Sequence, residues 1–147
     1  MAGTTAQAAA PVVVHSLSQA LDAALAAVEA AKPLDLLSAD GCGGAAGTGW
    51  FCALGDFVAE RFPDLPLRLT LDCADHPGIV LGALRRGVKS IIFTGDPAAA
   101  ARLDAIAAQT EAEIRRDRPI ALDLLGIRNP RTACAGWFAS GAGASLD

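Results

Sequence analysis

The stretch from Leu67 to Asp96, LRLTLDCADHPGIVLGALRRGVKSIIFTGD, predicts a strand, a loop, a helix and a second strand. The apolar runs near its two ends have the composition of buried strands. Pro77 can open the helix between them, because the first amides of a helix have no intrahelical partner. Gly87 can close that helix in the left-handed conformation that glycine adopts at helix ends. We therefore predict a βαβ unit for this stretch.

The rest of the chain repeats this alternation. Short apolar runs at 11–14 and 34–37 are typical of buried strands, and each precedes a predicted helix. The second of these helices carries a stripe at helical spacing that should lie on the sheet, made of Trp50, Leu54, Phe57, Val58 and Phe62. A fifth strand is predicted at either 113–116 or 120–125. The first is favoured, because charged residues on an edge strand discourage unwanted pairing.

Strand and helix alternate four times with short connections, which predicts an α/β fold with a parallel sheet of four to five strands. Two arrangements are open, a flavodoxin-like three-layer sandwich and a half-barrel with sequential strand order. The uniformly apolar strands favour the sandwich, in which helices cover both faces of the sheet. The run from Gly87 to Gly95, GVKSIIFTG, resembles the helix-to-strand segments of aldolase-type barrels. This resemblance identifies no family.

Three parts are expected along the 147 residues. Residues 1–10 form a flexible tail of small residues, and 11–126 form one α/β domain. Residues 127–147 are a glycine- and alanine-rich extension that nevertheless contains Trp137 and Phe138. This aromatic pair predicts that the extension packs on its own domain or on a neighbouring subunit.

Composition restricts the classes of partner. The net charge of −4 argues against a nucleic acid, since phosphate binding needs a basic surface. The sequence has no apolar run of about 18 residues that could span a membrane, and its start lacks the features of a signal peptide. The four cysteines include no Cys-x-x-Cys pair and are expected to be reduced thiols. We expect a cytoplasmic protein.

A candidate site follows from the position of the histidines. Ligands of parallel α/β sheets bind beyond the carboxyl ends of the strands. The predicted carboxyl ends carry both histidines of the chain, His15 and His76, together with Asp72. We predict that a histidine, oriented by Asp72, performs acid–base catalysis there. These groups and Cys73 could instead bind zinc, but a cap of the next helix by Asp75 or His76 is a simpler interpretation. No metal is therefore assigned.

A glycine-rich loop from Gly41 to Gly49, GCGGAAGTG, joins the second predicted strand to its helix. Backbone amides at the start of that helix could bind phosphate or another anion. The residues predicted to bind the ligand are Gly41, Gly43, Gly44, Gly47, Thr48, Asp75 and Thr94. The acidic residue that a dinucleotide motif requires about 20 residues later is missing, and the sequence identifies no cofactor. The expected ligand is a small anionic metabolite.

A second hypothesis is a non-enzymatic domain that forms homo-oligomers or binds a partner. The aromatic pair at 137–138 and the alanine-rich segments 23–27 and 98–101 would then mark subunit contacts. We prefer the ligand site, because both histidines and the glycine-rich loop are predicted on one edge of the sheet.

Overall fold

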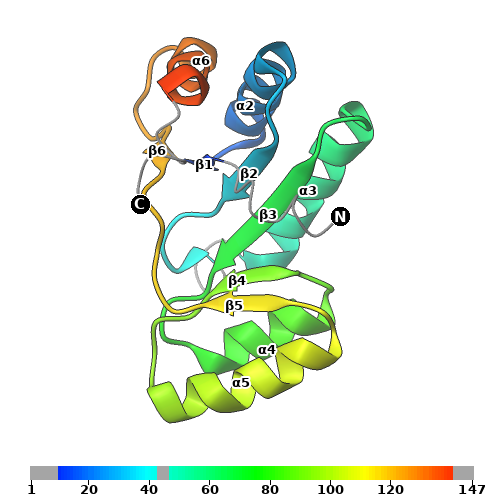
Figure 1. The fold of residues 1–147 in the computed structure, drawn as a ribbon, viewed down its shortest axis with the longest axis vertical. Coiled ribbons are helices and arrows are strands. Elements are labelled where there is room, and N and C mark those ends of the chain that lie inside the picture. Colours follow the sequence, from blue (N-terminus) through cyan, green and yellow to red (C-terminus); the bar gives the residue numbers. More distant parts are fainter. Residues whose placement is uncertain (1–9, 43–46, 141–147) are drawn as a thin grey trace.

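The computed structural model describes residues 10–42 and 47–140. Within these ranges, six strands form one sheet and five helices accompany it (Figure 1). The strands are β1 (Pro11–Val13), β2 (Leu34–Leu37), β3 (Leu67–Asp72), β4 (Ser90–Ile92), β5 (Glu113–Arg115) and β6 (Leu122–Asp123). The helices are α2 (Leu17–Ala30), α3 (Thr48–Arg61), α4 (Pro77–Arg85), α5 (Pro97–Gln109) and α6 (Pro130–Ser140). The predicted tail, 1–10, lies outside the described residues except for Ala10.

The sheet has the order β5-β4-β3-β2-β1-β6, and every neighbouring pair is parallel. This confirms the predicted parallel α/β fold. Of the two arrangements that the sequence left open, the sequential order is that of the half-barrel, whereas a flavodoxin-like sandwich has the order 2-1-3-4-5. When strands follow in order and crossovers are right-handed, successive helices fall on the same face. Both proposed positions of the fifth strand are occupied, by β5 at one edge of the sheet and β6 at the other.

The inner face of the curved sheet carries buried apolar residues, which is why the sequence favoured a sandwich with helices on both faces. Val13, Leu37 and Ile92 form a small buried cluster on this face, separate from the main core beneath the helices. Ala121 packs against the cluster from the segment that joins β5 to β6. This part of the inner face is therefore buried without a second layer of helices.

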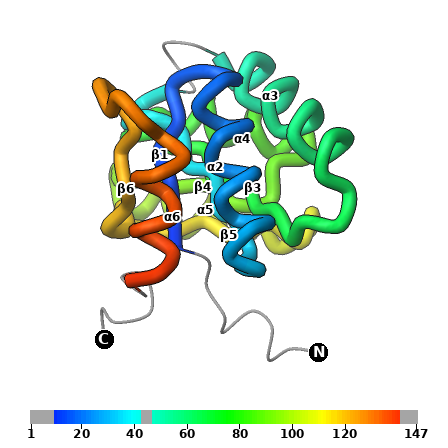
Figure 2. The backbone as a smooth tube through the Cα atoms, turned by 90° about the horizontal axis from the view of Figure 1, so that it is seen from above, coloured from blue at the N-terminus to red at the C-terminus, as the bar shows by residue number. Residues whose placement is uncertain are grey.

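The C-terminal extension supplies α6, which packs on α2 beside it (Figure 2). Cys134 and Phe138 are the buried residues of α6. The alanines of α2 allow close contact, since Ala20, Ala23 and Ala27 are all fully buried. Trp137 is partly buried against the main core as well, so both residues of the aromatic pair that suggested a subunit contact pack within the chain.

Helix α3 lies on the sheet through a different stripe from the one predicted. Its buried residues are Phe51, Leu54, Gly55 and Val58. Trp50 and Phe57 are 38% and 44% exposed, so their expected place on the sheet is wrong. The prediction counted only large side chains, whereas α3 contacts Leu69 of β3 at Gly55, which has no side chain.

We expect Gly55→Ala to lower the free energy of unfolding by about 1–3 kcal/mol, which is typical of overpacking a core. An added Cβ would lie 2.0 Å from Cδ1 and 2.9 Å from Cγ of Leu69. Gly136→Ala in α6 is the matched control, because a Cβ there meets nothing within 4 Å. That change should stabilise the protein by up to about 1 kcal/mol through helix propensity. Urea unfolding of both variants measures the sign of each change in the free energy of unfolding. Equal changes in the two variants would contradict the close contact between Gly55 and Leu69.

None of the helices in the described part of the chain is long and apolar enough to span a membrane.

Candidate functional site

The carboxyl edge of the sheet gathers polar side chains from four adjacent strands. His15 follows β1, Ser38 follows β2, and Asp72 and Asp123 belong to β3 and β6. The strand order β3-β2-β1-β6 places these four ends next to one another. The segment that runs from β5 to β6 passes along this edge (Figure 1) and contributes Arg118.

His15 and Asp123 form a close pair at this edge. The Nε2 atom of His15 lies 2.7 Å from Oδ1 of Asp123, and the two side chains are 24% and 54% exposed. Burial tends to raise the pKa of Asp123, but hydrogen bonds from the Leu125 amide and His15, with the charge of Arg118, lower the pKa below its ordinary value. A carboxylate can only accept hydrogen bonds, so the neutral imidazole carries its proton on Nε2. Nδ1 is then the ring nitrogen with a free lone pair for a proton.

Gln19, in the first turn of α2, connects the two strands that carry this pair. The His15 amide donates a hydrogen bond of 2.7 Å to Oε1 of Gln19, and Nε2 of Gln19 donates one of 3.1 Å to the Leu124 carbonyl. The helix start is itself fixed, because Ser16 accepts the Gln19 amide at 3.2 Å as the N-cap. One side chain therefore holds the ends of β1 and β6 in register.

Asp72 and Arg118 form a second, more buried pair. The Asp72 side chain is 3% exposed, and its Oδ2 accepts a hydrogen bond of 2.6 Å from Nη1 of Arg118. Its Oδ1 accepts the Ala74 amide at 2.8 Å. Arg118 also donates through Nη2 to the Ser38 carbonyl at 3.0 Å, and the Ser38 hydroxyl accepts the Asp72 amide at 2.9 Å. Arg118 thereby attaches the β5–β6 segment to the ends of β2 and β3.

The predicted catalytic residues thus have partners other than those expected. Among the described residues, Asp72 pairs with Arg118 and makes no direct contact with a histidine, while His15 pairs with Asp123. His76 occupies the N-cap position of α4 without a side-chain cap bond, and its Nε2 lies 3.5 Å from Oδ1 of Asp75. Both of these side chains are largely exposed. His76 and Asp75 therefore form an exposed pair of their own, distinct from the pairs of His15 with Asp123 and Asp72 with Arg118.

The predicted ligand-binding residues that the structure describes lie after β2, β3 and β4, at the same edge. Gly41 and Gly47 have φ angles of 68° and 98°, which favour glycine, and Thr48 begins α3. Gly43 and Gly44 lie outside the described residues. Thr94 is exposed after β4, and the neighbouring Asp96 caps α5 by accepting the Ala99 amide. How these residues contribute to a site stays a prediction.

The cysteine of the polar cluster is poorly suited to chemistry. Burial raises the pKa of the Cys73 thiol to about 12, and the Asp72 charge and Cys42 add to this. Thiolate is the form that binds metals and attacks electrophiles, so this thiol is held in its inert form. Across residues 10–42 and 47–140, no group of three or more His, Cys, Asp or Glu side chains is arranged to hold a metal ion.

A third cluster of polar side chains, missed by the sequence analysis, is buried on the adjacent strands β2, β3 and β4. The Thr70 hydroxyl donates to Oδ1 of Asp35 at 2.8 Å, and the Thr70 and Ser90 hydroxyls are 2.8 Å apart. All three residues are buried. Burial is the main cause that raises the pKa of Asp35 to about 6, although the Thr70 hydrogen bond opposes it. The sequence carried one signal for this cluster, because Asp35 stands within an otherwise apolar strand.

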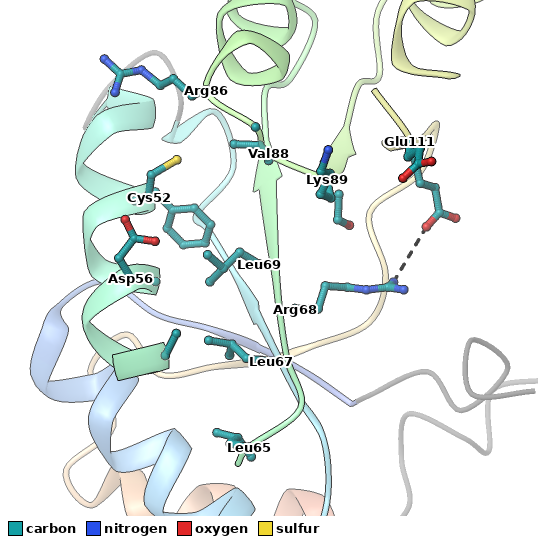
Figure 3. Close-up of a pocket in the computed structure, with 16 residues that line it drawn as sticks. Cys52, Asp56, Leu65, Leu67, Arg68, Leu69, Arg86, Val88, Lys89 and Glu111 are labelled. Carbon is teal, nitrogen blue, oxygen red and sulfur yellow. Dashed lines mark ion pairs between the residues drawn. The ribbon is translucent and has the colours of Figure 1, made fainter. Parts of the chain in front are cut away.

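A cavity of about 720 Å³ lies at the other end of the molecule, near the amino ends of β3 and β4 (Figure 3). It lies between α3 and the turn that leads into β4, and neither histidine contributes to it. The site predicted at the carboxyl edge and this cavity are therefore separate features.

Fold and site together describe a parallel α/β protein with barrel-like strand order and polar residues at its carboxyl edge. No family model matches the chain, and no curated protein matches it. Among solved structures, it is similar to a Coccidioides immitis protein described as a "putative fructose-1,6-biphosphate aldolase", with a TM-score of 0.59 and 17% identity. The match covers 94% of this chain and 54% of that one, so the chain spans about half the length of that protein. At this identity the likeness establishes the fold alone.

Proposed function

We propose that the carboxyl edge binds a small metabolite with a carboxylate or phosphate group, and that His15 exchanges a proton with it. The pair formed by His15 and Asp123 carries this proposal, because a carboxylate that fixes one imidazole nitrogen leaves the other able to take a proton. The carboxyl ends of the strands are also where barrel-like α/β enzymes hold their substrates. The structural neighbour supports this proposal only through its similar fold.

Each residue has a distinct role in this proposal. Nδ1 of His15 accepts the proton, and the Asp123 carboxylate stabilises the imidazolium that results. Arg118 is held by Asp72 and Ser38, and the N–H groups that these bonds do not use can donate to the ligand's anionic group. The amides at the start of α3, near Thr48, offer further donors to the anion.

We expect His15→Gln to weaken binding of an anionic ligand by about tenfold or more, the cost of one charge-assisted hydrogen bond. A thermal-shift screen against phosphorylated and carboxylated metabolites identifies the ligand, since one at 100 times its Kd adds about 2.7 kcal/mol of stability. Titration of the hit against the variant then measures the loss.

His76→Gln is the matched control, because His76 is exposed and its carboxylate partner is Asp75. It should leave the affinity of the same hit unchanged. A hit that binds His15→Gln and the unaltered protein equally well would place the ligand elsewhere. A screen without any hit would refute the small-ligand function.

A further inference from the structure

Strand β3 is unevenly covered on its helical face. Leu67, Leu69 and Leu71 point to the side where the main core lies, because side chains of a strand alternate between its two faces. Leu71 is fully buried, whereas Leu67 and Leu69 are only partly buried. The cavity of about 720 Å³ lies over these two residues, and Phe51 and Val88 also line it (Figure 3). The cavity therefore has an apolar floor that the helices leave accessible.

Two opposite charges line the cavity beside this floor. Asp56 belongs to α3, and Arg86 directly follows the last residue of α4. Both residues are exposed, and neither takes part in the ion pairs formed within residues 10–42 and 47–140. The Asp56 carboxylate can accept hydrogen bonds and the Arg86 guanidinium can donate them. Both groups are therefore available to a molecule in the cavity.

The two charges lie on either side of Cys52 along α3 (Figure 3). A Cβ added at Gly49, in the first turn of α3, would lie 3.2 Å from Nη1 of Arg86, so the guanidinium lies against that turn. Asp56 follows Gly49 by seven residues, which is about 10 Å along a helix that rises 1.5 Å per residue. Burial raises the pKa of the Cys52 thiol, the charge of Arg86 lowers it, and the charge of Asp56 raises it. Both charges thus act on the same part of the cavity without pairing with each other.

We propose that this cavity binds an α-amino acid with an apolar side chain. Arg86 pairs with the carboxylate of the ligand, and Asp56 pairs with its ammonium group. The side chain of the ligand lies on the apolar floor of the cavity. A ligand with a single charge would leave the opposite charge of the cavity without a partner, so a zwitterion is the complementary ligand. This is a second site, at the opposite end of the sheet from His15.

The dimensions of an α-amino acid fit the spacing of the two charges. Its N–Cα and Cα–C bonds hold the ammonium nitrogen about 2.5 Å from the carboxylate carbon. Charge-assisted hydrogen bonds add about 2.8 Å at each end, so the ligand and its contacts span about 8 Å. This is somewhat less than the offset of Asp56 from Gly49. Side chains of a helix lean toward its N-terminus, which brings the Asp56 carboxylate closer to Arg86 and accounts for the difference.

The apolar floor selects among amino acids. Burial of an aliphatic side chain on Leu67 and Leu69 stabilises the complex, whereas a hydroxymethyl side chain removes little apolar surface from water. L-leucine should therefore bind at least about tenfold more tightly than L-serine. The cavity has the volume of a small-molecule site and accommodates the larger side chain.

The test is an NMR titration of the full chain with L-leucine, in which the amides of Cys52 and Leu69 should shift. Two analogues each lack one charge: 4-methylpentanoate has no ammonium group, and 3-methylbutylamine has no carboxylate. Each should bind about tenfold or more weakly than L-leucine, the cost of one charge-assisted hydrogen bond. The absence of any shift with L-leucine, or equal binding of either analogue, would overturn the proposal. Shifts at His15 and Asp123 in place of Cys52 and Leu69 would also overturn it, since the ligand would then occupy the carboxyl edge.

Two substitutions remove the charges of the cavity one at a time. Arg86→Gln and Asp56→Asn should each weaken L-leucine binding by about tenfold or more. Both residues are exposed, so the variants should remain folded. Arg85→Gln in α4 and Glu60→Gln in α3 are the matched controls, because these exposed residues are not among the described residues that line the cavity. The controls should bind L-leucine as the unaltered protein does, and equal affinities in all four variants would refute the site.

Discussion

Replacing Arg118 with methionine should lower the free energy of unfolding by about 3 kcal/mol or more, because the change leaves the Asp72 carboxylate buried without its cation. Asp72 is almost fully enclosed, and its Oδ2 bond to Arg118 is 2.6 Å long. Methionine retains much of the apolar length of the side chain, so packing changes little. Urea unfolding at neutral pH measures the loss.

Arg116→Met is the matched control for this experiment. Arg116 lies two residues away and pairs with Asp104, but both side chains are about half exposed. An exposed pair contributes less than about 1 kcal/mol, so this variant should remain near the stability of the unaltered protein. Adding Asp72→Asn to Arg118→Met should recover part of the loss, since the buried charge is then removed. Similar losses in the two arginine variants would contradict the structural importance of Asp72.

Asp35→Asn should stabilise the protein at pH 8 by about 2–3 kcal/mol, since burial raises the pKa of Asp35 from its ordinary value of 3.8 to about 6. The folded state therefore holds the proton more tightly than the unfolded state. The stability that this carboxyl contributes is fully present below pH 3.8 and is lost as the pH rises through about 6. Asparagine keeps an oxygen to accept the Thr70 hydroxyl and carries no charge.

Unfolding free energies of the two proteins between pH 4 and pH 8 check this prediction. The advantage of Asp35→Asn should grow with pH and be small at pH 4. Asp64→Asn, at an exposed position before β3, should show no such pH-dependent gain. A constant difference across the pH range would show that the effect of Asp35→Asn does not come from its charge.

The elements of the fold could be predicted from local pattern, but their arrangement could not. The apolar run at 67–71, the proline at 77 and the glycine at 87 correctly marked β3 and the limits of α4. Their order in the sheet depends on contacts between distant segments. The apolar residues Val13 and Leu37 suggested helices on both faces, because no local signal shows that Ala121 covers them.

The candidate site shows the same limit. His15 and Asp72 were found because each stands at the end of an apolar run, and both lie at the carboxyl edge. Asp123 was missed because its strand, β6, has only two residues and forms through pairing with β1. Arg118 lies in a loop, where no periodicity indicates which side chain turns inward.

The pairing of β6 with β1 has a consequence for how the molecule folds. The other strand pairs join neighbours in sequence, whereas His15 and Asp123 are 108 residues apart. Closing so long a loop costs more chain entropy than closing the short βαβ connections, so we expect β6 and α6 to dock after the rest of the sheet has formed. In that order of folding, His15 meets its carboxylate partner Asp123 only in the last step, and local opening of this final unit would separate the pair while β2 to β5 remain folded.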